Sequence, residues 1–138
     1  MKRAIESAKI SDCEIPVGAI ILKDGQVIAS ASNKKESLKD VTCHAEILAI
    51  REAERVLDDW RLDDCEMYVT LEPCPMCAWA ILNAGIPKVY FGAYDTVYGS
   101  LGTAMDLRNY LHSKTDVVGG ILEEECSKLL KDYFKEIR

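Results

Sequence analysis

The sequence lacks an apolar run approaching the ~18 residues that a membrane span requires, although 49% of its 138 residues are hydrophobic. Its first residues, Met1 to Glu6, place a glutamate inside what would be the apolar region of a signal peptide. We therefore expect a cytoplasmic protein with no membrane partner. Thiols stay reduced in that compartment, so the six cysteines are not expected to form a disulfide framework.

An excess of positive charge is also missing. The chain has 17 Lys and Arg against 23 Asp and Glu, which gives a net charge of −6. This balance argues against a protein that coats nucleic acid non-specifically, but it leaves room for a local basic face. Internal repeats and low-complexity tracts are absent as well, so we expect residues 1–138 to form one domain.

What is present is an alternation of helical and β-rich patterns. An Asp-Gly pair at residues 24 and 25 separates two apolar β-rich runs and predicts a hairpin. Thr42 is a candidate N-cap for the long helix that follows the hairpin. The expected helices span 1–10, 43–57, 77–84, 105–111 and 122–137, and the expected strands span 17–22, 27–30, 67–71, 88–92 and 117–121. This order predicts a three-layer α/β/α domain with a mixed five-stranded sheet.

Two thiols lie three residues apart in Cys74-Pro75-Met76-Cys77, directly after the strand expected over 67–71. In the first turn of a helix they would lie side by side, where the positive dipole end stabilises thiolates. Three interpretations compete: a redox dithiol, a closed structural zinc site completed by Cys43 and His44, and an open catalytic zinc site with three protein ligands. Apart from the pair, the cysteines are typical of small buried apolar residues: Cys13, Cys43, Cys65 and Cys126.

His44 and Glu46 decide between these interpretations. In a regular helix their side chains point about 200° apart, so they serve one centre only if it lies over the helix end. The pattern favours an open zinc site with His44, Cys74 and Cys77 as ligands. Zinc lowers the pKa of a bound water towards ~7, and Glu46 is then placed to carry that water's proton.

His44-Ala45-Glu46 followed by Pro73-Cys74 and Cys77 matches the H-x-E…P-C-x-x-C pattern of zinc-dependent nucleobase deaminases. Over nearly its whole length the chain resembles the bacterial tRNA-specific adenosine deaminases, within the cytidine and deoxycytidylate deaminase family. The matching segments are 14–19, 43–47, 68–77, 89–95, 102–103, 120–126 and 133–138. The first three are shared with guanine and cytosine deaminases, and the later ones favour the tRNA enzymes.

This resemblance implies a cytidine-deaminase-like fold and one Zn²⁺ per subunit. It implies hydrolysis of adenosine to inosine at the tRNA wobble position, with release of ammonia. Water activated by zinc would attack C6 of the flipped-out adenine while Glu46 protonates N1 and then the leaving amine. Asn33 would hydrogen-bond the base. The family is homodimeric, and the anticodon loop lies across both subunits.

The last expected helix places its basic residues opposite its apolar stripe. Such a face beside aromatic residues suits phosphate contact and base stacking, although an ordinary solvated face has the same pattern. The possible RNA contacts are Lys128, Lys131, Tyr133, Phe134, Lys135 and Arg138. Three residues of the cysteine helix fit a dimer interface and a plain core equally well: Trp79, Ile81 and Leu82.

The chain departs from the family in two places. Val97 stands where the family commonly carries a lysine, and the segment 106–114 is shorter. A deaminase of a free nucleobase or nucleoside (guanine, cytosine or adenosine) is therefore the alternative interpretation.

Overall fold

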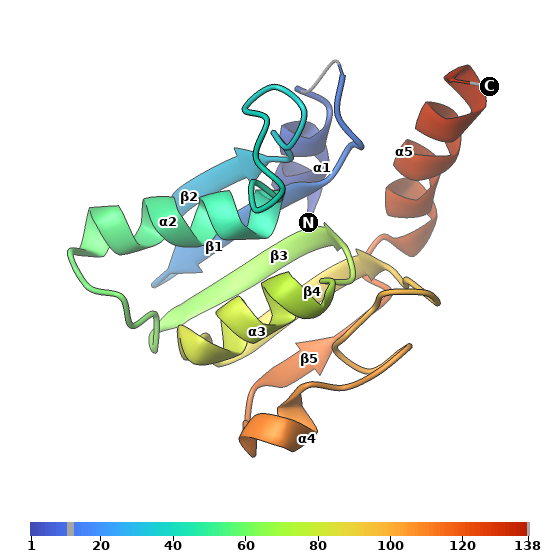
Figure 1. The fold of residues 1–138 in the computed structure, drawn as a ribbon. Helices are drawn as coiled ribbons and strands as arrows, with labels where there is room; N and C mark the ends of the chain where they lie inside the picture. The colour runs from blue at the N-terminus through green and yellow to red at the C-terminus, as the bar shows by residue number, and fades with distance from the viewer. Residues whose placement is uncertain (11–12, 138) are drawn as a thin grey trace.

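The computed structural model describes residues 1–10 and 13–137 and contains a five-stranded sheet with strand order β2-β1-β3-β4-β5 (Figure 1). β1 pairs antiparallel with β2 and β3, whereas β3, β4 and β5 run parallel. The strands are β1 (Gly18–Lys23), β2 (Gln26–Ser32), β3 (Cys65–Leu71), β4 (Lys88–Ala93) and β5 (Asp116–Val118). The predicted mixed five-stranded sheet is confirmed.

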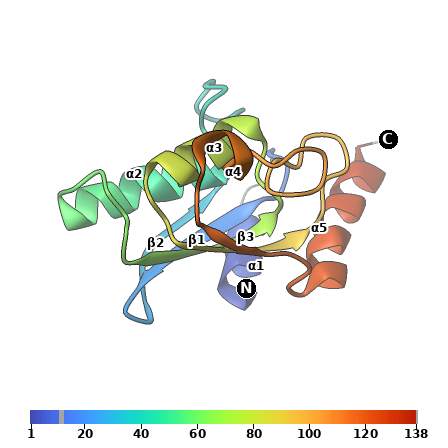
Figure 2. The ribbon, with the colours of Figure 1, turned by 90° about the horizontal axis from the view of Figure 1, so that it is seen from below.

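Helices cover both faces of this sheet. They are α1 (Lys2–Ala8), α2 (Ala45–Leu57), α3 (Pro75–Asn83), α4 (Arg108–Leu111) and α5 (Glu123–Glu136). Figure 2 shows α2 and α3 on one face and α1 and α5 on the other, so the three-layer α/β/α prediction is also confirmed. Among the described residues, no helix is long and apolar enough to cross a membrane.

The β1–β2 turn follows the predicted Asp-Gly chemistry. Asp24 and Gly25 both have positive φ, at 51° and 75°, which is the requirement of a type I′ turn. On β3, Met67 and Val69 are fully buried on the side of α2 and α3. Tyr68 points to the other face and stacks on Tyr90 with ring centroids 4.6 Å apart. The period-2 alternation of β3 thus separates the main core from the opposite layer.

Several predicted bounds need correction. α1 ends at Ala8 rather than at residue 10, α3 begins at Pro75 rather than at residue 77, α4 begins at Arg108 rather than at residue 105, and β5 ends at Val118 rather than at residue 121.

α2 begins at Ala45 rather than at residue 43, and Thr42 does not cap it, because its hydroxyl donates to the Asp40 carboxylate over 2.7 Å. In α5 only Cys126 is fully buried, whereas Ile137 is 63% exposed. The expected apolar stripe therefore does not reach the end of α5, where the helix runs past the sheet into solvent.

Candidate metal centre and adjoining pocket

The cysteine pair lies at the start of α3. Cys74 is the N-cap, with extended backbone (φ −71°, ψ 173°), and Pro75 takes the first helical position, where its missing N–H costs nothing. The Cys74 carbonyl accepts the first helical hydrogen bond from Ala78 N at 2.8 Å. Cys77, one turn later, is completely buried. The two sulfur atoms therefore meet at the helix end from a cap position and a first-turn position.

α2 starts in the same way. His44 is its N-cap, again extended (φ −71°, ψ 154°), and Glu46 lies in the first turn. Because a cap residue lies outside the helical register, the ~200° separation expected within a regular helix does not apply. The late start of α2 at Ala45 thus lets both side chains face the space over the helix end.

The two helix starts bring three metal-ligand atoms together. His44 Nδ1 lies 3.7 Å from Cys74 Sγ and 3.5 Å from Cys77 Sγ, and the three ligand atoms lie within 4.8 Å of one another. Tetrahedral zinc with Zn–S bonds of ~2.3 Å and a Zn–N bond of ~2.05 Å requires N···S separations of about 3.6 Å. The donor set and its spacing therefore fit Zn²⁺, with the histidine ligating through Nδ1.

Cys43 does not belong to this group. Its buried sulfur accepts a hydrogen bond from Arg51 at 3.9 Å, on α2. A closed four-ligand site made with Cys43 is therefore not what the described residues form. Three protein donors leave a fourth zinc position for water, which is the arrangement of a catalytic site.

The electrostatics of the helix starts favour a thiolate at Cys74. A hydrogen bond from the Cys77 thiol and one from His44 lower the pKa of Cys74 to about 4, against the opposing effect of burial. The hydrogen bond to Cys74 and burial raise the pKa of Cys77. Burial also raises the pKa of Glu46 to about 7. The lowered pKa of Cys74 suits a thiolate ligand, and the raised pKa of Glu46 suits a carboxyl group that transfers protons near neutral pH.

A pocket of about 630 Å³ opens directly over this centre. We call its metal end the floor; His44, Glu46 and Cys74 line it, and Cys77 lies behind them. We call its outer edge the rim, formed by residues 94–98 and by α5. The residues that line the rim and walls are Ile15, Val17, Asn33, Lys35, Leu71, Glu72, Tyr94, Asp95, Thr96, Val97, Tyr98, Leu130 and Phe134.

Asn33 lines the pocket wall and is 8% exposed. Its side-chain amide donates to Ile15 O at 3.3 Å and accepts from Lys35 N at 3.4 Å. These bonds tie the end of β2 to the segment before β1, so Asn33 shapes the wall as well as facing the pocket.

The candidate RNA contacts on α5 are not equivalent. Phe134 lines the pocket and meets Tyr133 edge-on, with ring centroids 5.2 Å apart. Lys128 forms an ion pair with Asp132 at 2.6 Å, whereas Lys131 and Lys135 are exposed. Arg138 lies outside the described residues. Among the five members of this set that the structure describes, only Phe134 lines the pocket.

The pocket residues that the sequence did not single out include Lys35, Glu72 and Leu130. Leu130 follows the apolar pattern of α5, and Lys35 belongs to a polar loop, so neither carries a distinctive signal. Glu72 does carry a distinctive signal. It is a carboxylate between a buried strand and Pro73-Cys74, and no basic residue lies next to it in the sequence.

Comparison with known proteins places this geometry in context. Residues 1–93 match the family model of the cytidine and deoxycytidylate deaminase zinc-binding region. The chain is 44% identical to a tRNA-specific adenosine deaminase of Bacillus subtilis, across all of this chain and 88% of that protein. A solved structure from a study of A-to-I editing by tRNA:A34 deaminases at the wobble position superposes with a TM-score of 0.87 and 40% identity, over 94% of this chain and 97% of that one.

A guanine deaminase structure from Bacillus subtilis is also 40% identical, but it superposes with a TM-score of 0.64, over 80% of this chain and 71% of that one. Equal identity thus goes with a poorer structural match and a shorter overlap.

Proposed function

The chain belongs to the cytidine and deoxycytidylate deaminase zinc-binding family, and on that premise we propose that it hydrolyses adenosine to inosine at the wobble position of tRNA, releasing ammonia. The observation that carries the proposal is the superposition with the wobble-editing structure over 97% of that chain. The guanine deaminase matches over a smaller part of its length. The agreement therefore extends beyond the zinc motif, which free-base deaminases share.

We assign the zinc ligands to His44 Nδ1, Cys74 Sγ and Cys77 Sγ, one Zn²⁺ per chain. When bound there, zinc would lower the pKa of a coordinated water towards ~7 and so supply the nucleophile for C6 of the adenine. His44 would bind in its neutral form, with its proton on Nε2. The cap positions of His44 and Cys74 and the burial of Cys77 place the three donors at the two helix starts.

Glu46 moves the protons. It is 4% exposed, lines the pocket floor and lies two residues from the ligand His44. Its carboxylate would take one proton from the attacking water and deliver it to N1 of the adenine. It would then take the remaining hydroxyl proton and deliver it to the amino group, which leaves as ammonia. Each proton of the water is thereby accounted for.

The pocket wall orients the base. Asn33, already fixed by Ile15 and Lys35, would hydrogen-bond the edge of the flipped-out adenine. Phe134 at the rim would contact a base beside it, because aromatic side chains stack on unpaired RNA bases. Exposed lysines on α5 would contact phosphates. Since the substrate is tRNA, we place the protein in the cytoplasm.

We also propose a homodimer. Ile81 and Leu82 belong to the core, at 0% and 8% exposure, so of the three interface candidates only Trp79, at 46%, is available. Light scattering would measure the mass of the wild type and of Trp79→Ala in solution. A dimer that Trp79→Ala weakens, while Tyr110→Ala on α4 leaves it intact, is the expected result; a monomeric wild type contradicts the proposal.

The experiment that tests the function compares substrates. The protein would be incubated with an anticodon stem-loop carrying adenosine at the wobble position and, separately, with guanine, cytosine and free adenosine. Inosine at the wobble position without turnover of the free compounds is the expected result. Turnover of a free base or nucleoside and an unchanged stem-loop would establish the alternative function.

A further inference from the structure

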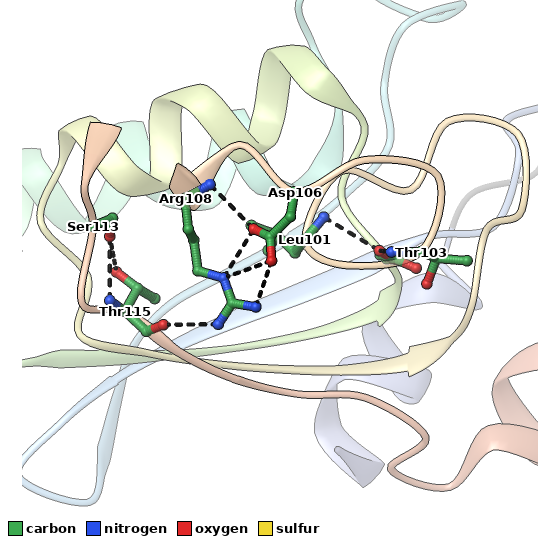
Figure 3. A network of polar contacts seen from close by, with 7 residues as sticks. Leu101, Thr103, Asp106, Arg108, Ser113 and Thr115 are labelled. Carbon is green, nitrogen blue, oxygen red and sulfur yellow. Dashed lines mark hydrogen bonds and ion pairs between the residues drawn. The ribbon is translucent and has the colours of Figure 1, made fainter. Parts of the chain in front are cut away.

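Glu72 lies between β3 and the cysteine helix and is only 1% exposed. Among the described residues, its carboxylate is in no ion pair. Instead its oxygens accept hydrogen bonds from backbone N–H groups: Asp95 N at 3.3 Å, Leu101 N at 3.2 Å and Thr103 N at 3.1 Å; Figure 3 shows Leu101 and Thr103. A carboxylate that accepts several N–H donors needs no cation to be stable when buried.

All three donors belong to residues 94–103, which we call the rim loop. This loop supplies the pocket with Asp95, Thr96, Val97 and Tyr98. Leu101 anchors one end of the loop in the core at 3% exposure, but the part that lines the pocket gains little from apolar burial, because Val97 and Tyr98 are 66% and 63% exposed. Polar anchors must therefore fix its shape.

The rim loop is hydrogen-bonded to the two residues that directly precede Cys74 and the metal-binding helix α3. Besides the three bonds to Glu72, Ser100 N donates to Pro73 O at 2.9 Å. Gly99 packs so closely that a Cβ there would lie 2.5 Å from the Glu72 carboxyl and 2.3 Å from Asp95 O. The two residues before Cys74 thus hold the rim loop through hydrogen bonds that span 23 to 31 residues.

We propose that Glu72 is a positioning residue: it holds the rim loop in the shape that receives the part of the RNA around the target adenosine, and so sets the affinity for polynucleotide substrate. The inference rests on the proposed function. The hydrogen bonds of the Glu72 carboxylate go to backbone N–H groups of the rim loop and to none of the zinc ligands, so Glu72 acts through the backbone of the loop. Its loss should weaken substrate binding while leaving the chemistry at the floor intact.

Glu72→Gln tests this, because it keeps the size of the side chain but turns one acceptor oxygen into a donor that faces N–H groups. We expect the KM for the anticodon stem-loop to rise about tenfold, while kcat stays within about twofold of the wild-type value. This pattern is typical of losing an interaction that stabilises the bound substrate and the transition state equally. Zinc content should stay at the wild-type level. Hydrogen exchange of the amides in residues 95–103 should become faster.

Glu14→Gln is the matched control for the exchange measurement. Glu14 is also a buried carboxylate, 3% exposed, and it accepts from the N–H groups of Glu36 and Ser37 at 2.8 and 2.7 Å. Its loss should speed exchange in the loop around residues 34–39 and leave the rim loop protected. Gly99→Ala disturbs the same anchor from the loop side, and it should reproduce the rise in KM and the faster exchange at unchanged zinc content.

Unchanged KM and unchanged exchange in folded Glu72→Gln would overturn the proposal. A fall in kcat with zinc loss at constant KM would overturn it too, because that pattern indicates general damage to the fold. If Glu72→Gln does not fold, Gly99→Ala decides by the same readouts. If the wild type leaves the stem-loop unchanged, the proposed function fails, and the exchange data alone decide whether Glu72 anchors the loop.

Discussion

The floor of the pocket and its rim are held by different interactions. On the floor, His44 and Cys74 are helix N-caps and Glu46 is buried in a first turn, so packed helices fix them. On the rim, Val97, Tyr98 and Phe134 are 66%, 63% and 43% exposed, and a loop and the end of α5 present them. The difference indicates that chemistry and substrate choice are separable here: changes on the floor should affect zinc and kcat, and changes on the rim should affect KM.

The largest effect is expected from removal of a floor ligand. Cys77→Ala should lose the zinc and reduce deamination to background, because two protein donors remain where catalytic zinc sites use three. Metal analysis and the stem-loop assay measure both. Cys43→Ala is the control, since its sulfur faces Arg51; it should keep one zinc per chain. A Cys77→Ala protein with full zinc content would contradict the ligand assignment.

Glu46→Gln should separate zinc binding from catalysis. The variant should keep its metal but lose roughly 10²–10⁴-fold in kcat, the usual contribution of a positioned acid–base group. Glu52→Gln, on the exposed side of the same helix and paired with Arg55, should retain wild-type kcat. A Glu46→Gln enzyme as active as wild type would show that another group carries the protons.

Phe134→Ala tests the rim by itself. Stacking on an unpaired base contributes ~1–3 kcal/mol, so we expect KM for the stem-loop to rise roughly tenfold while kcat and zinc content stay constant. Tyr110→Ala removes an aromatic ring that is 73% exposed but outside the pocket and should change neither constant. A drop in kcat without a change in KM would place Phe134 in the chemistry instead.

A smaller effect is expected from the lysines of α5. Lys131→Ala should reduce the slope of log affinity against log salt by about 0.7, the contribution of one phosphate contact to a single strand. Lys128→Ala should reduce it less, because Asp132 already pairs with Lys128. Binding titrations of the stem-loop at several salt concentrations measure both slopes. Equal slopes in both variants would indicate that the ion pair opens on binding.

The smallest effect concerns the loop that Glu14 holds beside the pocket. Burial raises the pKa of Glu14, but hydrogen bonds from the N–H groups of Glu36 and Ser37 outweigh it and leave the pKa below the usual 4.5. A carboxyl group with a depressed pKa stabilises the fold above its unfolded-state pKa, and this contribution is lost as the pH falls. The Tm difference between wild type and Glu14→Gln should therefore shrink between pH 7 and about pH 3; a constant difference would show that the charge of Glu14 is irrelevant.

Much of the fold was predictable because it depends on local patterns. The Asp24-Gly25 turn and the succession of helices and strands along the chain follow from turn chemistry and periodicity. The helix α3 was expected from residue 77, but it begins at Pro75, because proline is well suited to the first helical position. The start of α2 was not predictable from the sequence. Thr42 is a good N-cap residue in principle, and only its hydrogen bond to Asp40 removes it from that role. The exposed end of α5 was missed for a similar reason, since an amphipathic pattern does not show where the sheet beneath it ends.

The sequence by itself determined which chemistry the protein can support, because a histidine, a glutamate and a cysteine pair in this pattern supply a zinc donor set and a proton carrier. The tertiary structure decided how these residues meet. The extended caps at His44 and Cys74 point them over two helix ends, Cys43 faces Arg51 instead, and Glu72 reaches backbone N–H groups up to 31 residues away. Such partners are backbone groups that every residue carries, so no pattern of side chains identifies them, and only the folded chain brings them within hydrogen-bond distance.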